Sequence, residues 1–169
     1  MKLDIPDIDT PRLRLRAPCI DDFPVYHRFF ADAEASHFYG GPMSEATAWR
    51  KLAADIGHWV LRGYGVWALE MKGEGRCVGT AGLVWPTGWP RPELTWWISQ
   101  DAQRQGIATE ASQAVIRWAY AHGWAQVQTH MKDENMAARN LVAKLGGSVI
   151  ARETFPDGVE RDVFLLPRP

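Results

Sequence analysis

Gln103-Arg104-Gln105-Gly106-Ile107-Ala108 is a short loop that opens directly into a helix, and the fold is organised around it. The run Glu93-Leu94-Thr95-Trp96-Trp97-Ile98 before it has the composition of a strand, and Thr109-Glu110-Ala111 continues the helix. The first turn of a helix carries unpaired backbone N–H groups and the positive end of the helix dipole, so a phosphate binds there without dedicated basic side chains. Gly106 lets a phosphate approach the backbone, and Ala108 keeps the helix entrance narrow. The loop therefore predicts an anion site.

The chain before the loop begins with a strand and two helices. Residues 12–16 alternate with period two, so we expect a strand whose leucines face the core. Its three arginines share the other face, which indicates either a solvated face or a role in binding a phosphate or an acidic partner. An acidic cap at residues 21–22 with the early Pro24 predicts the first helix, and Ser44 caps the second. The spacing predicts that the first helix buries Tyr26, Phe29, Phe30 and Ala33 and the second Trp49, Leu52, Ala53, Ile56, Trp59 and Val60.

The remaining elements alternate between strands and helices. In order, we expect strands at 66–71, 77–85 and 93–99, a helix from the central loop to Gly123, a strand at 126–131, a helix capped by Asn135, and a hairpin over 148–166. This mixture of strands and helices, with no repeat and no linker, predicts an α/β fold in one domain spanning residues 1–169.

The composition is that of an ordinary globular chain, with 46% hydrophobic and 23% charged residues. The net charge of −1 argues against a nucleic-acid partner. Cys19 and Cys77 have no C-x-x-C spacing, which favours a reducing compartment. With no leader and no apolar run of the ~20 residues that a membrane span needs, we expect a cytoplasmic protein. The five histidines lack metal-ligand spacing, so we expect no metal and give them ordinary core or surface roles.

Two regions resemble the GCN5-related N-acetyltransferases (GNAT). Gln103-x-x-Gly106-x-Ala108 is similar to the family pattern Q/R-x-x-G-x-G/A, and residues 93–111 look like the branch of ribosomal-protein N-terminal acetyltransferases (RimJ/RimL-like), with Thr95 where that branch usually has Gly. Residues 135–146 are similar to the family's N-x-A-S-x-x-L-x-x-K-L-G helix. The resemblance covers nearly the whole chain. It implies a central mixed sheet of about six to seven strands with helices on both faces, and acetyl-CoA as the donor.

The resemblance also implies where acetyl-CoA binds. Its pantetheine arm lies between two diverging strands that end near Ser99 and Met131, the first of them bulged, and pairs with their free backbone groups. Its pyrophosphate binds the amides of the central loop. A solvated role is an equal alternative for Arg139 and Lys144. The expected cofactor contacts are Trp97, Ile98, Ser99, Gln103, Arg104, Gln105, Gly106, Ile107, Ala108, Thr109, Asn135, Arg139 and Lys144.

Acetyl transfer to an amine needs a base, because free amines titrate between about pH 8 and 10.4. Glu93 is the candidate, since family members carry a carboxylate near the start of this strand that faces the acceptor cleft. A surface glutamate beside a proline-rich loop is the alternative. A backbone N–H near Trp97 or Ile98 is expected to stabilise the oxyanion.

The leaving thiolate has no evident proton donor. Many family members carry a tyrosine where this chain has Val142, and the ribosomal-type relatives carry a hydroxyl residue where it has Ala138. A thiol titrates near ~8.5, so unassisted departure is tolerable. Asn135 or water is the expected source of help.

The resemblance places an aromatic acceptor site beside the bulged strand, which an apolar or cationic amine fits by contact and cation–π attraction. One of the adjacent Trp96 and Trp97 must face the core. The expected acceptor residues are Phe38, Tyr39, Gly40, Gly41, Trp85 and Trp96.

We therefore predict an N-acetyltransferase that moves an acetyl group from acetyl-CoA to a primary amine by direct transfer in a ternary complex. The amine is a protein N-terminal α-amino group or a small molecule, and the oligomeric state, a homodimer included, stays open. The alternative is a non-catalytic acyl-CoA-binding sensor domain. The missing hydroxyls at Ala138 and Val142 favour the sensor, and Glu93 opposes it.

Overall fold

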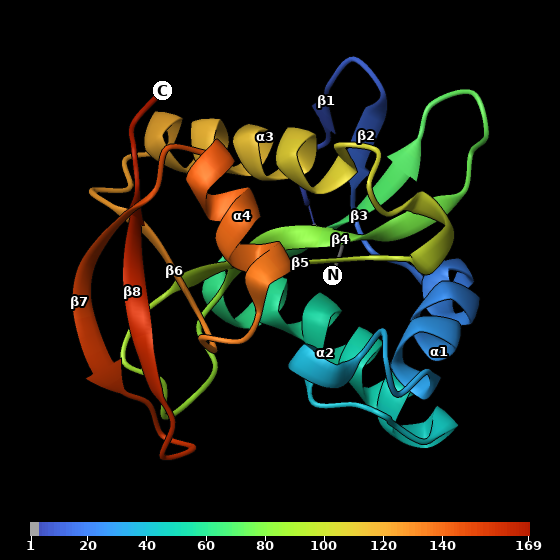
Figure 1. The fold of residues 1–169 in the computed structure, drawn as a ribbon. Helices are drawn as coiled ribbons and strands as arrows, with labels where there is room; N and C mark the ends of the chain where they lie inside the picture. Colours follow the sequence, from blue (N-terminus) through green and yellow to red (C-terminus); the bar gives the residue numbers. More distant parts are fainter. Residues whose placement is uncertain (1–3) are drawn as a thin grey trace.

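The computed structural model describes residues 4–169 (Figure 1). Its strands are β1 (Ile8–Asp9), β2 (Leu13–Arg16), β3 (Val66–Met71), β4 (Cys77–Val84), β5 (Glu93–Ile98), β6 (Val127–Met131), β7 (Ser148–Thr154) and β8 (Glu160–Leu166). Its helices are α1 (Phe23–Ala31), α2 (Glu45–Arg62), α3 (Ile107–Ala121) and α4 (Met136–Lys144), with short 3-10 turns at Ile20–Asp22, His37–Tyr39 and Gln100–Ala102. The sequence predicted each of these helices and every strand except β1.

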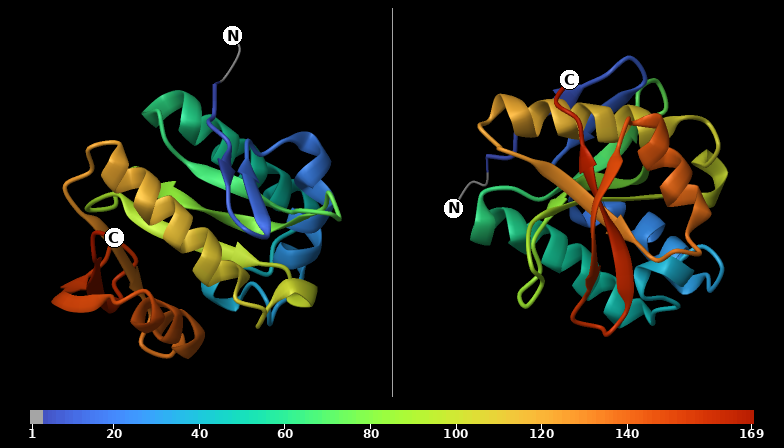
Figure 2. Two further views of the ribbon diagram at one scale, coloured as in Figure 1. Left: turned by 90° about the horizontal axis from the view of Figure 1, so that it is seen from above. Right: turned by 60° about the vertical axis from the view of Figure 1, so that its left-hand side comes forward.

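The strands form two antiparallel sheets, in the orders β1-β2-β3-β4-β5 and β6-β8-β7. The sheets meet where β5 and β6 lie side by side, and there Thr129 Oγ1 donates to the carbonyl of Leu94 at 2.9 Å. Across the five-stranded sheet, α3 covers one face and α1 and α2 cover the other (Figures 1 and 2). The α/β fold with helices on both faces is confirmed. The expected sheet is divided at the β5–β6 junction, because β6 takes β8 as its ladder partner.

Two hydrophobic cores lie on opposite faces of β5. The larger core lies against α3, and the smaller one, which includes Phe29, Phe30 and Trp97, lies against α1 and α2. The Trp97 ring stacks on Phe29 with centroids 4.6 Å apart. Because successive strand residues face opposite sides, its neighbours Trp96 and Ile98 point to the other face.

The buried face of α2 differs from the expected one. Leu52 and Trp59 are buried as predicted, but Asp55 is also buried, and its carboxylate accepts a hydrogen bond from the Tyr26 hydroxyl at 2.9 Å. A buried carboxylate needs a hydrogen-bonding partner, so the face of α2 that carries Asp55 is turned toward Tyr26. The predicted apolar face of α2 is therefore only partly buried. Trp49, Ala53 and Val60 are consequently exposed.

The start and end of α1 also differ from the expectation. Asp22 holds the N-cap position without capping the helix through its side chain. Its carboxylate instead accepts two hydrogen bonds from the guanidinium of Arg16, at 2.7 and 2.9 Å, and this pairing raises the pKa of Arg16 above its usual value. The solvated face expected for the β2 arginines is therefore wrong for Arg16. The helix ends at Ala31, which leaves Ala33 beyond it and exposed.

Candidate active site

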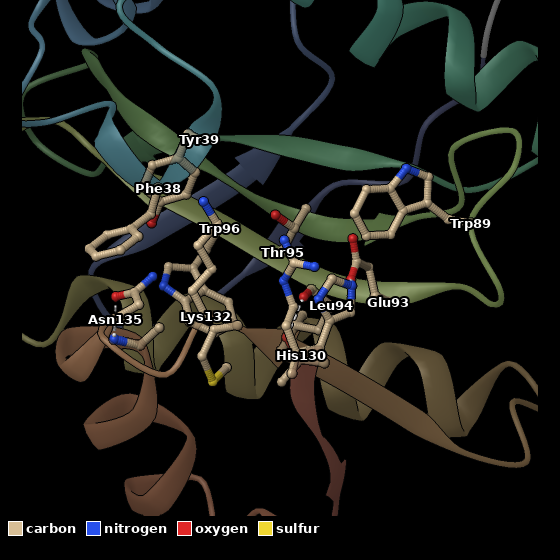
Figure 3. Close-up of a pocket in the computed structure, with 14 residues that line it drawn as sticks. Phe38, Tyr39, Trp89, Glu93, Leu94, Thr95, Trp96, His130, Lys132 and Asn135 are labelled. Atoms are coloured by element: carbon tan, nitrogen blue, oxygen red, sulfur yellow. Dashed lines mark hydrogen bonds and ion pairs between the residues drawn. The ribbon is translucent and has the colours of Figure 1, made fainter. Parts of the chain in front are cut away.

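A cavity of about 210 Å³ opens where β5 and β6 diverge (Figure 3). Both strands run in the same direction along it, from Glu93 and His130 toward Trp96 and Lys132. Its lining residues are Phe38, Tyr39, Trp89, Glu93, Leu94, Thr95, Trp96, Thr129, His130, Met131, Lys132, Asn135, Ala138 and Arg161. The cavity therefore joins the two sheets, the start of α4 and the loop before α2.

The edge of β5 that faces β6 has free backbone groups. The amide of Ser99 donates to Val78 of β4, and backbone groups two residues apart face the same side, so those of Trp97 also face β4. The groups of Trp96 and Ile98 then face the opposite edge, where the carbonyl of Ile98 accepts from Gln103 Nε2 at 2.9 Å. The open strand edge that the resemblance implied is present, and the binding of the cofactor along it stays a prediction. The backbone groups of Trp97 face β4, and its ring lies in the smaller core. Only the backbone groups of Trp96 and Ile98 are therefore placed to contact a cofactor at the open edge.

The bulge that the resemblance implied for β5 is absent from its pairing with β4. The register is continuous from the Gly79–Ile98 pair to the Val84–Glu93 pair. Gly79 has φ +147°, and a Cβ there would lie 2.1 Å from the carbonyl oxygen of Trp97, so β4 approaches β5 closely without a bulge. The cavity lies at the opposite edge of β5, beside β6, whose ladder partner is β8.

The loop Gln103–Ala108 leaves its amides unpaired from residue 104 onward, while the N–H of Gln103 donates to the carbonyl of Gln100. Gly106 is the N-cap of α3 at φ +77°, and Arg104 has φ +61°, so the chain turns sharply into the helix. No acceptor within residues 4–169 pairs with the backbone N–H groups of residues 104–109. Such a row of amides at a helix start fits the pyrophosphate of acetyl-CoA. Gln103, by contrast, is tied to Ile98.

Arg12, which directly precedes β2, braces this loop. Its Nη1 donates to the carbonyl of Gln105 at 2.7 Å, and its Nε donates to Glu110 at 2.6 Å. Burial alone would raise the pKa of Glu110, but hydrogen bonds from Thr10 and Arg12 outweigh it, and the pKa lies below its usual value. The sequence predicted an arginine face on β2, and the tertiary structure directs one arginine to the cofactor loop.

Gly106→Val tests the loop. A β-branched side chain at φ +77° is strained, with an expected cost of about 1–2 kcal/mol, and its Cβ would lie 3.3 Å from Arg12 Nη2. We expect acetyl-CoA affinity, measured by calorimetry, to fall about tenfold or more, since 1.4 kcal/mol is tenfold. Gly123→Val is the control, because Gly123 has φ +84° at the far end of α3 and a Cβ added there would have no atom within 4 Å. Equal affinity losses in both variants would contradict this role of the loop.

Glu93 and His130 meet at the other end of the cavity. A carboxylate oxygen of Glu93 contacts His130 Nε2, and the two side chains are 16% and 11% exposed. The imidazole stacks on Trp89 with centroids 5.4 Å apart and packs against Phe155. The sequence prediction gave His130 an ordinary role. The one feature of the sequence that could have indicated a role for His130 is its place in a strand expected beside β5. That place does not reveal that His130 contacts Glu93.

The residues expected from α4 have different positions. Asn135 lines the cavity and caps α4, with its Oδ1 accepting from the amide of Ala138 at 3.2 Å. Arg139 donates to Asp162 at 2.8 Å and is held against β8, while Lys144 is exposed at the last turn. Asn135 alone of the three expected α4 residues borders the cavity.

The aromatic residues of the acceptor side separate into two groups. Phe38, Tyr39 and Trp96 line the cavity as expected, but Gly40, Gly41 and Trp85 do not, and Trp89 does. The indole N–H of Trp85 donates to the carbonyl of Trp89 at 2.8 Å, so Trp85 supports that loop from behind. Burial raises the pKa of Tyr39 to about 12, so its phenol stays protonated at neutral pH.

Arg161 is a cavity residue that the sequence did not indicate. Its side chain is 7% exposed and makes two hydrogen bonds to the Asp157 carboxylate, which raise the pKa of Arg161 above its usual value. The same guanidinium holds the pKa of Asp157 below its usual range.

Within residues 4–169, no cluster of three His, Cys, Asp or Glu side chains has the arrangement of a metal site. No helix in the described part of the chain has both the length and the apolar character of a membrane span.

An open strand edge that leads to an amide-lined helix start is the arrangement that the resemblance implies for binding acetyl-CoA. A family model described as an acetyltransferase (GNAT) domain matches residues 12–148, and the chain belongs to this family. The chain is therefore an acetyl-CoA-dependent acyltransferase, as the resemblance implied.

Solved structures agree with this fold. An acetyltransferase from Agrobacterium tumefaciens is 26% identical with a TM-score of 0.88, over 99% of this chain and 97% of that one. A putative GNAT-family acetyltransferase from Bordetella pertussis is 23% identical with a TM-score of 0.79, over 96% and 100%. RimL, a ribosomal alpha-N-protein acetyltransferase in complex with coenzyme A, is 15% identical with a TM-score of 0.75, over 95% and 97%. The last two share the fold.

Proposed function

We propose that this protein is an N-acetyltransferase that transfers the acetyl group of acetyl-CoA directly to a primary amine in a ternary complex. One observation carries the proposal: a single cavity holds the carboxylate of Glu93 and borders the open edge of β5 that leads to the cofactor loop. An amine bound beside Glu93 would lie next to a thioester bound along that edge. The acetyl group could then pass directly to the amine, with no acetyl-enzyme intermediate. The proposed unit is one domain, residues 1–169, acting in the cytoplasm.

The proposed acceptor is a protein N-terminal α-amino group or a small-molecule amine. The aromatic wall of Phe38, Tyr39, Trp89 and Trp96 supports an amine that carries apolar groups. RimL, which shares the fold, is a protein α-amino acetyltransferase, and this likeness supports the protein N-terminus as one of the two classes.

Each need of the reaction has a proposed group in the cavity or along the open edge of β5. Glu93 is required for removal of a proton from the ammonium group of the acceptor. The N–H of Ile98 on the open edge stabilises the oxyanion, and Asn135 or water assists the thiolate. An ammonium R–NH3⁺ and the thioester then give the amide, the free thiol and one proton. Acetyl-CoA supplies the activated acyl group, and the amides of residues 104–109 hold its pyrophosphate.

Thiol release tests the proposed function. We expect the purified protein to release free thiol from acetyl-CoA with one class among N-terminal peptides, amino acids and small amines, and mass spectrometry to show the matching acetylated product. Omission of the amine is the control. Tight acetyl-CoA binding without thiol release from any amine would contradict the transferase proposal and favour the sensor domain.

A further inference from the structure

One nitrogen in the cavity wall has no partner. His130 Nδ1 is buried, and no hydrogen-bond partner lies near it among residues 4–169. Buried polar atoms in folded proteins are nearly always hydrogen-bonded, so such an atom calls for an explanation. The other ring nitrogen, Nε2, contacts the carboxylate of Glu93.

The contact with Glu93 assigns the tautomer of the imidazole. An ionised carboxylate only accepts hydrogen bonds, so Nε2 must carry the hydrogen in this pair. A neutral imidazole has one N–H, so Nδ1 then carries the free lone pair. This tautomer makes Nδ1 a basic nitrogen, itself buried, on a residue that lines the cavity.

The surroundings of His130 fix the ring in place and tolerate a positive charge on it. The ring is nearly parallel to Trp89, with an interplanar angle of 7°, and it also packs on Phe155. The charged side chains that line the cavity with His130 are Glu93 on β5, Lys132 just after β6 and Arg161 on β8. The guanidinium of Arg161 lies over the Trp89 and Phe155 rings that pack on the imidazole. The charge of Arg161 is balanced by its two hydrogen bonds to Asp157, which leaves Glu93 to balance an imidazolium.

We propose that His130 is the proton-accepting group of the acetyl transfer and that Glu93 is a positioning residue that holds its tautomer and balances its charge. This inference rests on the proposed function. The proton leaves the acceptor's ammonium group and ends on Nδ1, so His130 becomes an imidazolium against the Glu93 carboxylate. The amine attacks the acetyl carbonyl, the carbon–sulfur bond breaks, the thiolate takes the second amine proton, and His130 returns its proton to solvent.

General chemistry favours this division of roles. Free carboxyls titrate near about 4.3, free imidazoles near about 6.5, and free amines between about 8 and 10.4. A catalytic base is most effective when it titrates near the working pH, so an imidazole suits the reaction better than a carboxylate alone. A carboxylate that orients an imidazole and balances its charge is also the arrangement of the serine-hydrolase triad.

Nuclear magnetic resonance of the 15N-labelled imidazoles tests the pair without any turnover. We expect the Nε2–H tautomer for His130 in the wild type at neutral pH, and loss of this preference in Glu93→Gln, because an amide side chain both donates and accepts. An Nδ1–H tautomer in the wild type would overturn the inference.

The kinetics of the His130→Gln variant test the role of His130 as proton acceptor. The quantity to measure is kcat at saturating amine, because the titration of the free amine does not affect kcat. We expect kcat to fall about 10²–10⁴-fold, with acetyl-CoA affinity and melting temperature close to the wild type. Protonation of the imidazole removes the proposed base, so the wild-type kcat should fall at low pH and the variant should lack this dependence. His122→Gln is the matched control, because His122 is exposed and stacks on Trp118.

The outcomes separate the inference from the proposed function. Absence of turnover with every amine in the wild type would overturn both. Turnover in the wild type with an unchanged kcat and pH profile in His130→Gln would overturn only the role of His130. If His130→Gln lowers the melting temperature, His130→Asn provides a second variant, and the tautomer measurement on the wild type still decides the pairing.

Discussion

Glu93→Gln is expected to lower kcat for amine acetylation about 10²–10⁴-fold, while acetyl-CoA affinity stays within about twofold. The change keeps the size of the side chain but removes the negative charge that contacts His130 Nε2. Deprotonation of the acceptor then loses both the oriented imidazole and the balancing charge. Affinity is retained because the loop at residues 104–109 lies apart from Glu93, which the cavity lining places beside His130 and Trp89. Stopped-flow thiol release and calorimetry measure the two quantities.

The matched control is Glu153→Gln on β7. Glu153 pairs with Arg91 at 2.7 Å and lies outside the cavity lining, so its loss should leave kcat near the wild type. A Glu93→Gln enzyme that keeps wild-type kcat would exclude Glu93 from the chemistry, both as a base and as the residue that positions His130.

Trp97→Ala is expected to lower the free energy of unfolding by about 3–5 kcal/mol, the cost of removing a large buried aromatic side chain. The ring is 3% exposed, stacks on Phe29, and meets Tyr26 and Phe30 edge-on with centroids 4.9 and 5.4 Å away. The surrounding rings come from α1, and the backbone of β5 is held by β4, so the cavity left by the indole cannot collapse fully. For a chain of this size, the loss corresponds to a melting temperature lower by roughly 6–20 °C.

Trp49→Ala is the control for the same substitution at the surface. Trp49 on α2 is 51% exposed, so its removal should change the free energy of unfolding by about 0.5 kcal/mol or less. Urea unfolding of both variants with equal m-values measures the difference. Equal destabilisation by the two changes would mean that Trp97 is not a member of the smaller core.

The cofactor loop was the most predictable part of the site. Its chemistry is local: a glycine, a helix start and a preceding strand are contiguous in the sequence and together define a row of free amides. The same reasoning predicted the cap of α4, because Asn135 and the amide of Ala138 are three residues apart. Short-range geometry of this kind depends little on the rest of the chain.

Side-chain direction was less predictable where two choices had similar local merit. Trp96 and Trp97 have the same residue type at adjacent strand positions, and only the helices packed on the sheet decide which ring enters the smaller core. On α2 the apolar residues cover a broad stripe, and the pairing of the buried Asp55 with Tyr26 selects which part of it faces inward. In both cases, tertiary packing determines which side chain is buried.

The sequence by itself determined the order of the elements and the amide-lined loop, because these follow from periodicity and from neighbours in the chain. The family was indicated by the resemblance of two motifs. The tertiary structure alone decided the opening between β5 and β6, the brace from Arg12 to Gln105, and the pairing of Glu93 with His130. Each joins residues far apart in the sequence, and a contact of that kind depends on how whole strands are placed. The residues proposed to handle the proton therefore become recognisable only once the two sheets are brought together.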